Sequence, residues 1–342
     1  MTTDDGPTKF PAKIRIISPT SIHVPRWNQP SAHRRDSKNL QFHTGIGYSP
    51  GHWGEIVQGW LRHNGELIVA LLTLVDRTYG TTAVAIPRRG TGVFSSQAEK
   101  WKAFKAAYLT LEALGVKTGL SFRLRSTIPI GVGGGSSTSD CTALGRAIIA
   151  AVGASGKPIT DLELLQKIVF AAEGACDPLP LLDWGLPLLW ASRAGKVLHV
   201  FSRPLPQLYA LGFVTEPGRM VSTDALASAQ AKLAVPQADV DRFAKILQTL
   251  DMAIATGAAL GVGEAATASG TLNQKHCPIA HWDDLCKLAE KVGAVGTSCS
   301  HSGTAAALLW DPATDNLAAR VAEATAEVQQ LGATYIHEFR PS

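Results

Sequence analysis

The chain has 342 residues, of which 45% are hydrophobic and 18% charged, and its formal net charge is +4. The length suits two domains or two fused lobes around a substantial core. No apolar run approaches the ~18 residues that span a bilayer, and five scattered cysteines without a CxxC pair argue against a disulfide framework or a zinc site. We therefore expect a protein of the reducing cytoplasm with no membrane partner.

Residues 1–44 carry all of the excess positive charge and are rich in Pro, Ser, Thr and His. This composition is typical of a flexible or peripheral extension. Basic residues can also mark nucleic-acid binding, but no basic–aromatic interleaving accompanies them here. We interpret residues 1–44 as a basic extension and expect no nucleic-acid partner.

Regular patterns begin at Gly45. Residues 66–75 and 79–87 are apolar and rich in β-formers, which predicts two neighbouring strands. In residues 97–115 large apolar side chains recur every three or four positions and Gly115 follows, as in an amphipathic helix with a glycine C-cap. Residues 120–130 begin with the alternation of a half-buried strand.

The rest of the chain mixes helices and strands in two halves. The patterns predict helices at 137–152, 161–175, 239–258, 282–292 and 314–331, a hairpin of 186–192 with 196–201, and a strand pair at 293–303 and 304–312, with the second half beginning near 209–217. No internal repeat is evident. This order predicts an α+β fold, with an N-terminal domain at 45–205 and a C-terminal domain at 206–342.

The most informative stretch is IPIGVGGGSSTSDCTALGRAI, residues 128–148. Four glycines and four hydroxyl residues stand here between a predicted strand and a predicted helix. Glycines let the backbone approach an anion closely, and the first N–H groups of the helix, with the helix dipole, attract negative charge. The flanks favour a phosphate-binding loop over a flexible linker.

Two common nucleotide loops fit poorly. A Walker A loop needs a lysine that is absent here. A GxGxxG match at Gly131, Gly133 and Ser136 lacks its last glycine, and residues 150–160 contain no ribose-binding acid. A dinucleotide fold is therefore a weak alternative.

The segment Pro129-Ile-Gly-Val-Gly-Gly-Gly-Ser-Ser-Thr138 resembles the Pro-x-x-x-Gly-Leu-Gly-Ser-Ser-Ala signature of the GHMP kinases. SPGHWGEIVQG (49–59) and SHSGTAAALL (300–309) resemble the first and third motifs of that family, in the form carried by the propanediol-utilisation type L-threonine kinases. Residues 138–140 and 269–274 also look like that subfamily. The resemblance runs in register over about residues 46–310.

The resemblance implies a GHMP kinase fold, with a ribosomal-S5-like N-terminal domain, a C-terminal α+β domain and the active site in the cleft between them. It implies ATP and Mg²⁺ as cofactors and Ser137 as a magnesium ligand, completed by the carboxylate of Glu173. The residues implied to hold the phosphates are Pro129, Gly131, Gly133, Gly134, Gly135, Ser136, Ser137 and Thr138.

The carboxylates of the family's mechanism have three candidates here, Glu173, Asp177 and Asp183. The subfamily usually spaces its pair as Glu-x-x-Asp, whereas Glu173 and Asp177 are one residue further apart. Asp177 is expected to orient the acceptor hydroxyl or accept its proton. Asp183 is the alternative, although its place before Trp184-Gly185 is typical of a turn residue.

Further residues are expected to line the cleft on the substrate side: Glu55, Asp76, His301, Ser302, Gly303 and Thr304. Glu55 could instead be a strand-edge or salt-bridge carboxylate. His52 and Trp53 replace residues that are small in the threonine kinases, so the acceptor pocket is expected to have a different shape.

Together these features predict an ATP-dependent phosphotransferase that acts on the hydroxyl of a small molecule. The resemblance makes an amino acid the expected acceptor and L-threonine the first candidate, with a place in cobalamin side-chain synthesis or a specialised pathway. The alternatives are another alcohol such as homoserine, or a nucleotide-binding regulator that has lost turnover. The sequence leaves a homodimer open.

Overall fold

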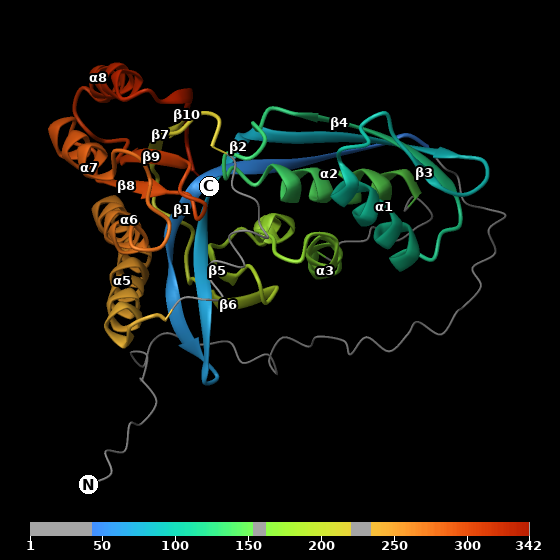
Figure 1. Cartoon of the computed structure of the whole chain (residues 1–342), viewed down its shortest axis with the longest axis horizontal. Coiled ribbons are helices and arrows are strands. Elements are labelled where there is room, and N and C mark those ends of the chain that lie inside the picture. Colours follow the sequence, from blue (N-terminus) through green and yellow to red (C-terminus); the bar gives the residue numbers. More distant parts are fainter. Residues whose placement is uncertain (1–42, 153–161, 220–233, 342) are drawn as a thin grey trace, which may run out of the picture.

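The computed structural model describes residues 43–152, 162–219 and 234–341 (Figure 1). Nearly all of the basic extension predicted at 1–44 lies outside these residues. Within the described ranges no helix combines the length and the apolar composition that crossing a membrane requires.

Two long antiparallel strands form the spine of the sheet, β1 (Gly45–His63) and β2 (Glu66–Arg88). They are joined at Asn64-Gly65, where both residues have positive φ (51° and 83°), as in the Asn-Gly turns that favour tight hairpins. Among the described residues the sheet has ten strands. Eight of them follow the order β10-β7-β9-β8-β1-β2-β4-β3, while β5 pairs with β2 and β6 pairs with β5. In Figure 1 one part of these strands runs between the helices of the two halves, and the other part bends over α2 of the N-terminal half.

The N-terminal half covers one face of its strands with helices. Its further strands are β3 (Val93–Phe94), β4 (Gly119–Ser126), β5 (Leu188–Ala191) and β6 (Lys196–Val200). The helices are α1 (Trp101–Ala113), α2 (Ser136–Val152), α3 (Leu162–Glu173) and the short 3₁₀ helix η2 (Leu179–Trp184). Helix α2 packs against β1, β2 and α1, and its stripe of small apolar residues lies in a buried cluster with Phe122 and Leu124 of β4.

The C-terminal half covers both faces of its strands, β7 (Tyr209–Val214), β8 (Gly296–Cys299), β9 (Ala305–Trp310) and β10 (Thr334–Phe339). Alternate residues of β7 and β9 pack on α5 (Gln237–Thr256) and α6 (Ala259–Asn273), and the others pack on α7 (Trp282–Lys291) and α8 (Leu317–Gln330). This explains why 305–310 reads as an unbroken apolar run rather than an alternating strand.

The α+β composition is confirmed, and several predicted elements need correction. Residues 66–75 and 79–87 are not two strands but parts of the single strand β2, whose pairing with β1 shifts register near Asp76. The helix predicted at 97–115 begins at Trp101, and the strand predicted at 120–130 ends at Ser126. Helix α6 and strand β10 were not predicted.

The two halves are joined within the sheet, where Glu55 of β1 pairs with Cys299 of β8. The domain limits 45–205 and 206–342 stay a prediction, because the sheet and the largest buried cluster run through both halves.

Candidate active site

The glycine loop lies between β4 and α2, as its flanking patterns predicted. Gly131, Gly133 and Gly135 have φ of 80°, 74° and 70°, a region that side chains other than glycine rarely adopt. Helix α2 begins directly afterwards at Ser136. The local geometry is therefore that of a loop whose backbone N–H groups and helix N-terminus can receive an anion.

The first turn of α2 is fixed by three interactions. The Ser139 hydroxyl donates to the Ser49 carbonyl at 2.9 Å. The Asp140 carboxylate accepts from the Thr81 hydroxyl at 2.8 Å and pairs with the Lys100 ammonium at 2.7 Å. Buried and paired in this way, Asp140 holds the helix start against β1 and β2.

The loop passes between the first and third motifs with no room for side chains. A Cβ at Gly133 would lie 2.2 Å from Ser302 Oγ, and a Cβ at Gly135 would lie 2.6 Å from His52 Nε2. The His52 backbone N–H also donates to the Gly134 carbonyl at 3.3 Å. Three segments that lie far apart in the sequence therefore converge on one point, with glycine at the two tightest approaches.

Glu173, at the end of α3, faces the start of α2. Its carboxylate accepts a hydrogen bond from the Thr138 hydroxyl at 2.5 Å and lies 3.4 Å from the Lys102 ammonium. Burial raises the pKa of Glu173, against the opposing effects of Lys102 and of hydrogen bonds from Ser137 and Thr138. Ser137 and Glu173 thus supply a hydroxyl and a carboxylate side by side, which are oxygen ligands of the kind that Mg²⁺ prefers.

Asp177 lies on the other side of the same helix start, against the loop. Its Oδ2 is 3.2 Å from His52 Nε2 and 3.2 Å from the position that a Cβ at Gly135 would take. Burial tends to raise the pKa of Asp177, but His52, His301 and a hydrogen bond from Thr138 outweigh it and hold the pKa below its ordinary value. The extra residue between Glu173 and Asp177 therefore leaves both carboxylates next to Thr138.

Glu55 of β1 is the third carboxylate of this cluster and is 3% exposed. Burial raises its pKa to about 7, with His52 opposing and Asp177 adding to the rise. Glu55 is therefore not the exposed strand-edge carboxylate that the sequence left open.

The third motif forms a compact loop stabilised by its own hydroxyl groups. The Ser300 hydroxyl accepts from the backbone N–H groups of Thr304 and Ala305 at 3.1 and 3.0 Å, and Ser302 is bonded to Ser300 and Thr304. His301 Nδ1 donates to Gln58 Oε1 at 2.8 Å. Burial and the nearby Arg193 lower the pKa of His301 to about 4, so its ring is neutral at pH 7.

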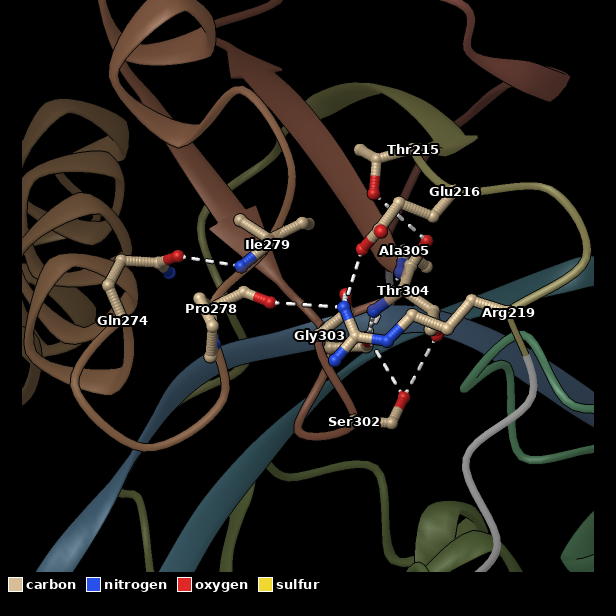
Figure 2. A network of polar contacts seen from close by, with 11 residues as sticks. Thr215, Glu216, Arg219, Gln274, Pro278, Ile279, Ser302, Gly303, Thr304 and Ala305 are labelled. Carbon is tan, nitrogen blue, oxygen red and sulfur yellow. Dashed lines mark hydrogen bonds and ion pairs between the residues drawn. The ribbon is translucent and has the colours of Figure 1, made fainter.

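Arg219 ties this loop to its surroundings from the far side (Figure 2). Its guanidinium pairs with Glu216 and donates to the carbonyls of Pro278 and Gly303, at 3.3 and 3.5 Å. It thereby links the end of β7, the segment after α6 and the third motif. Arg219 thus helps to fix the loop on which Gly133 rests.

Two predicted residues have other surroundings. Asp76 is fully buried, and its carboxylate accepts from Trp53 Nε1 at 3.2 Å and from the backbone N–H and hydroxyl of Thr78, and pairs with His337 at 3.1 Å. Asp183 is half exposed and pairs with Arg146 at 2.8 Å. Asp183 therefore lies at the surface near the end of η2 rather than in a turn, and Asp76 lies in a closed hydrogen-bond network.

Comparison with known proteins places this geometry in a recognised architecture. A family model described as the GHMP kinases N terminal domain matches residues 102–180, which include the glycine loop, Glu173 and Asp177. The crystal structure of homoserine kinase from Cytophaga hutchinsonii aligns with a TM-score of 0.65 at 18% identity, covering 89% of this chain and 97% of that one. The chain has the GHMP kinase fold.

Other solved structures with this fold give similar values. The L. major mevalonate kinase in complex with R-mevalonate has a TM-score of 0.62 at 16% identity, over 90% of this chain and 98% of that one. The Lactococcus lactis galactokinase complexed with galactose has 0.61 at 17% identity, over 87% and 94%. No curated protein sequence matches the chain significantly.

Sequence reasoning missed part of the polar surroundings that the GHMP kinase fold assembles here. Lys102 beside Glu173, Arg193 near His301 and Arg219 beneath the third motif carry no local signature, because each reaches the site from a different element. His52 was expected only to alter the pocket shape, whereas it lies against both Asp177 and Gly135. Its place in the first motif was the one available signal.

Proposed function

We propose that this protein is an ATP- and magnesium-dependent kinase that transfers a phosphoryl group to the hydroxyl of a small molecule. The observation that carries the proposal is the convergence at the start of α2. The glycine loop, the hydroxyls of Ser137 and Thr138, and the carboxylates of Glu173 and Asp177 lie together there. The solved neighbours named as homoserine kinase, mevalonate kinase and galactokinase support the same reaction class.

Phosphoryl transfer asks a protein mainly for positioning and for stabilisation of charge. In this proposal the backbone N–H groups of residues 131–138 hold the nucleotide phosphates. Ser137 and Glu173 hold Mg²⁺, which neutralises charge on those phosphates when it is bound. The Lys102 ammonium beside Glu173 limits the like-charge repulsion between that carboxylate and the nucleotide.

Asp177 is the carboxylate that we assign to the acceptor hydroxyl. It lies against the loop and is 18% exposed, so an acceptor can reach it from the solvent side. Its lowered pKa keeps it ionised at neutral pH but makes it a weak base. Its main task is therefore to orient the hydroxyl, with the proton accepted late in the transfer. Asp183 does not lie against the loop, because it pairs with Arg146 at the surface.

The acceptor class rests on the motif resemblance, which favours an amino acid and makes L-threonine, giving O-phospho-L-threonine, the first candidate. Cobalamin side-chain synthesis is the corresponding pathway. Homoserine or another specialised amino acid is the runner-up. A regulator without turnover is disfavoured, because Glu173 and Asp177 both lie next to the helix start rather than far from it.

The test is a panel of amino acids and simple alcohols assayed for ADP release with Mg²⁺-ATP. Acceptor-dependent ADP release with L-threonine, and a phosphorylated product by mass spectrometry, support the full proposal. Release only with another alcohol moves the acceptor to the runner-up. ATP binding without release for any acceptor favours the regulator.

A further inference from the structure

Three side chains that can ligate a metal meet beside the phosphate loop. His52 and Glu55 come from β1 and Asp177 from the segment after α3. Each offers one ligand atom, and these atoms all lie within 4.8 Å of one another. His52 and Glu55 are each 3% exposed, so the three groups meet in a low-dielectric environment.

The His52 ring directs Nε2 at the other two groups of the cluster. The Gly54 backbone N–H donates to Nδ1 at 3.3 Å, so Nδ1 is the acceptor and the ring proton lies on Nε2. Nε2 faces Asp177 Oδ2 at 3.2 Å. A cation bound at Nε2 would displace this proton, and the neutral ring would then carry its proton on Nδ1, so the contact from the Gly54 N–H would have to open.

Glu55 is the observation that points to a ligand rather than to a simple ion pair. Its Oε2 makes no hydrogen bond of normal geometry among the described residues, although the Thr73 hydroxyl is near enough to the carboxylate to lower its pKa. Buried carboxylate oxygens are nearly always satisfied. The same carboxylate belongs to the cluster within 4.8 Å. Burial raises its pKa to about 7, so near neutral pH it either keeps a proton or needs a positive charge.

We propose that His52, Glu55 and Asp177 form a divalent-cation site separate from the magnesium position at Ser137 and Glu173. One imidazole with two carboxylates is the ligand set of Mn²⁺, Fe²⁺ or Zn²⁺, whereas Mg²⁺ prefers oxygen ligands alone. Ligand atoms about 2.0–2.2 Å from one ion lie roughly 3–4 Å apart, so small side-chain rotations close the cluster around it.

The site faces the nucleotide loop. A Cβ at Gly135 would lie 2.6 Å from His52 Nε2 and 3.2 Å from Asp177 Oδ2. The backbone of the loop at Gly135 therefore packs directly against these two ligands. Thr138 connects the two sites, because its hydroxyl donates to Glu173 and a hydrogen bond from it also lowers the pKa of Asp177. The two cation positions therefore flank one helix start.

The experiment is Mn²⁺ binding to the full-length protein without nucleotide or acceptor, followed by electron paramagnetic resonance. We expect one tightly bound Mn²⁺ with nitrogen modulation in the electron spin echo, which reports imidazole ligation directly. His52→Gln and Glu55→Gln should each weaken binding by at least about tenfold. Mg²⁺ should compete only weakly.

Two matched variants separate this site from its neighbours. Glu173→Gln removes the carboxylate of the proposed nucleotide–magnesium position, and Asp183→Asn removes a surface carboxylate; both should retain Mn²⁺ with its nitrogen signal. Absence of nitrogen modulation in the wild-type protein, or equal affinity in all four variants, would overturn the proposal. The nitrogen modulation in the wild-type spectrum is sufficient to test the site. The test therefore still holds if one of the variants fails to fold. No step of the test depends on kinase activity.

Discussion

His52 Nε2 lies 3.2 Å from Asp177 Oδ2, although the two residues are 125 positions apart in the chain. The Gly54 N–H accepted by Nδ1 fixes the ring, so the imidazole donates from Nε2 and holds the carboxylate in one orientation. Gly135 lies against both groups without a side chain. The relationship therefore joins the first motif, the phosphate loop and the assigned acceptor carboxylate in one arrangement.

The first prediction concerns which aspartate acts on the acceptor. Asp177→Asn keeps the shape of the side chain but removes its charge, and we expect kcat to fall by about 10²–10⁴-fold. Asp183→Asn removes a half-exposed surface carboxylate paired with Arg146, and kcat should stay within about twofold, because exposed ion pairs contribute little. Steady-state ADP release with the best acceptor of the panel measures both. Equal losses in the two variants, or none in Asp177→Asn, would contradict the assignment.

The second prediction concerns the magnesium ligand. Ser137→Ala removes one hard oxygen beside Glu173, so we expect the Mg²⁺ concentration for half-maximal rate to rise and kcat to fall by about 10–100-fold. Ser298→Ala is the matched control, since Ser298 is buried on β8 and its hydroxyl has no partner among the described residues. An Mg²⁺ titration of the rate distinguishes the two variants. An unchanged Mg²⁺ requirement in Ser137→Ala would remove Ser137 from the metal site.

The elements that the sequence predicted well carry their large apolar residues at one regular spacing. Helix α2 repeats apolar residues at helical spacing and was predicted nearly to its ends. Helix α6, ALGVGEAATASGTLN, is small and apolar around most of its circumference, because it packs on α5, β1 and β8 together, and no stripe marks it. The long strand β1 was missed for a similar reason: residues 49–57 are buried on both faces and show no alternation.

The candidate site likewise has residues that the sequence could predict and contacts that it could not. The loop, Ser137, Glu173 and Asp177 lie within 50 residues, and their order and spacing made them predictable. The contact of His52 with Asp177 depends on the path of β1 past the start of α2, which no local pattern encodes. Asp76 was expected in the cleft, but its carboxylate is enclosed by Thr78, which is close in sequence, and by Trp53 of β1 and His337 of β10, which are not.

The third prediction separates backbone strain from steric fit in the loop. Gly135→Ala and Gly257→Ala introduce alanine at nearly the same φ, 70° and 73°. At Gly257, the C-cap of α5, a Cβ meets nothing within 4 Å, whereas at Gly135 it meets His52 at 2.6 Å. We expect Gly257→Ala to cost about 1 kcal/mol of unfolding free energy and to keep full activity. Gly135→Ala should cost about 1–3 kcal/mol more, because His52 must move, and should abolish most turnover.

Urea unfolding and ADP release measured on both glycine variants check this prediction. If both variants lose the same unfolding free energy and Gly135→Ala keeps its activity, the close approach of the loop to His52 is not required for turnover.

The fourth prediction follows from Glu55, whose pKa burial raises from 4.5 to about 7 in the folded protein. Between these pH values the unfolded chain releases the proton while the folded protein keeps it, so the unfolding free energy falls as the pH rises and levels off above about 7. Glu55→Gln removes this dependence. The stability of the wild type relative to Glu55→Gln should therefore fall by up to about 3 kcal/mol from pH 4.5 to pH 8.

Urea unfolding of both proteins at pH 5, 6, 7 and 8 measures this difference, with Glu264→Gln on the exposed face of α6 as the control for loss of one negative charge. A difference between wild type and Glu55→Gln that stays constant over this range would mean that Glu55 is ionised at pH 5 in the folded protein. Adding Mn²⁺ should flatten the wild-type profile, since a bound cation removes the reason for Glu55 to keep its proton.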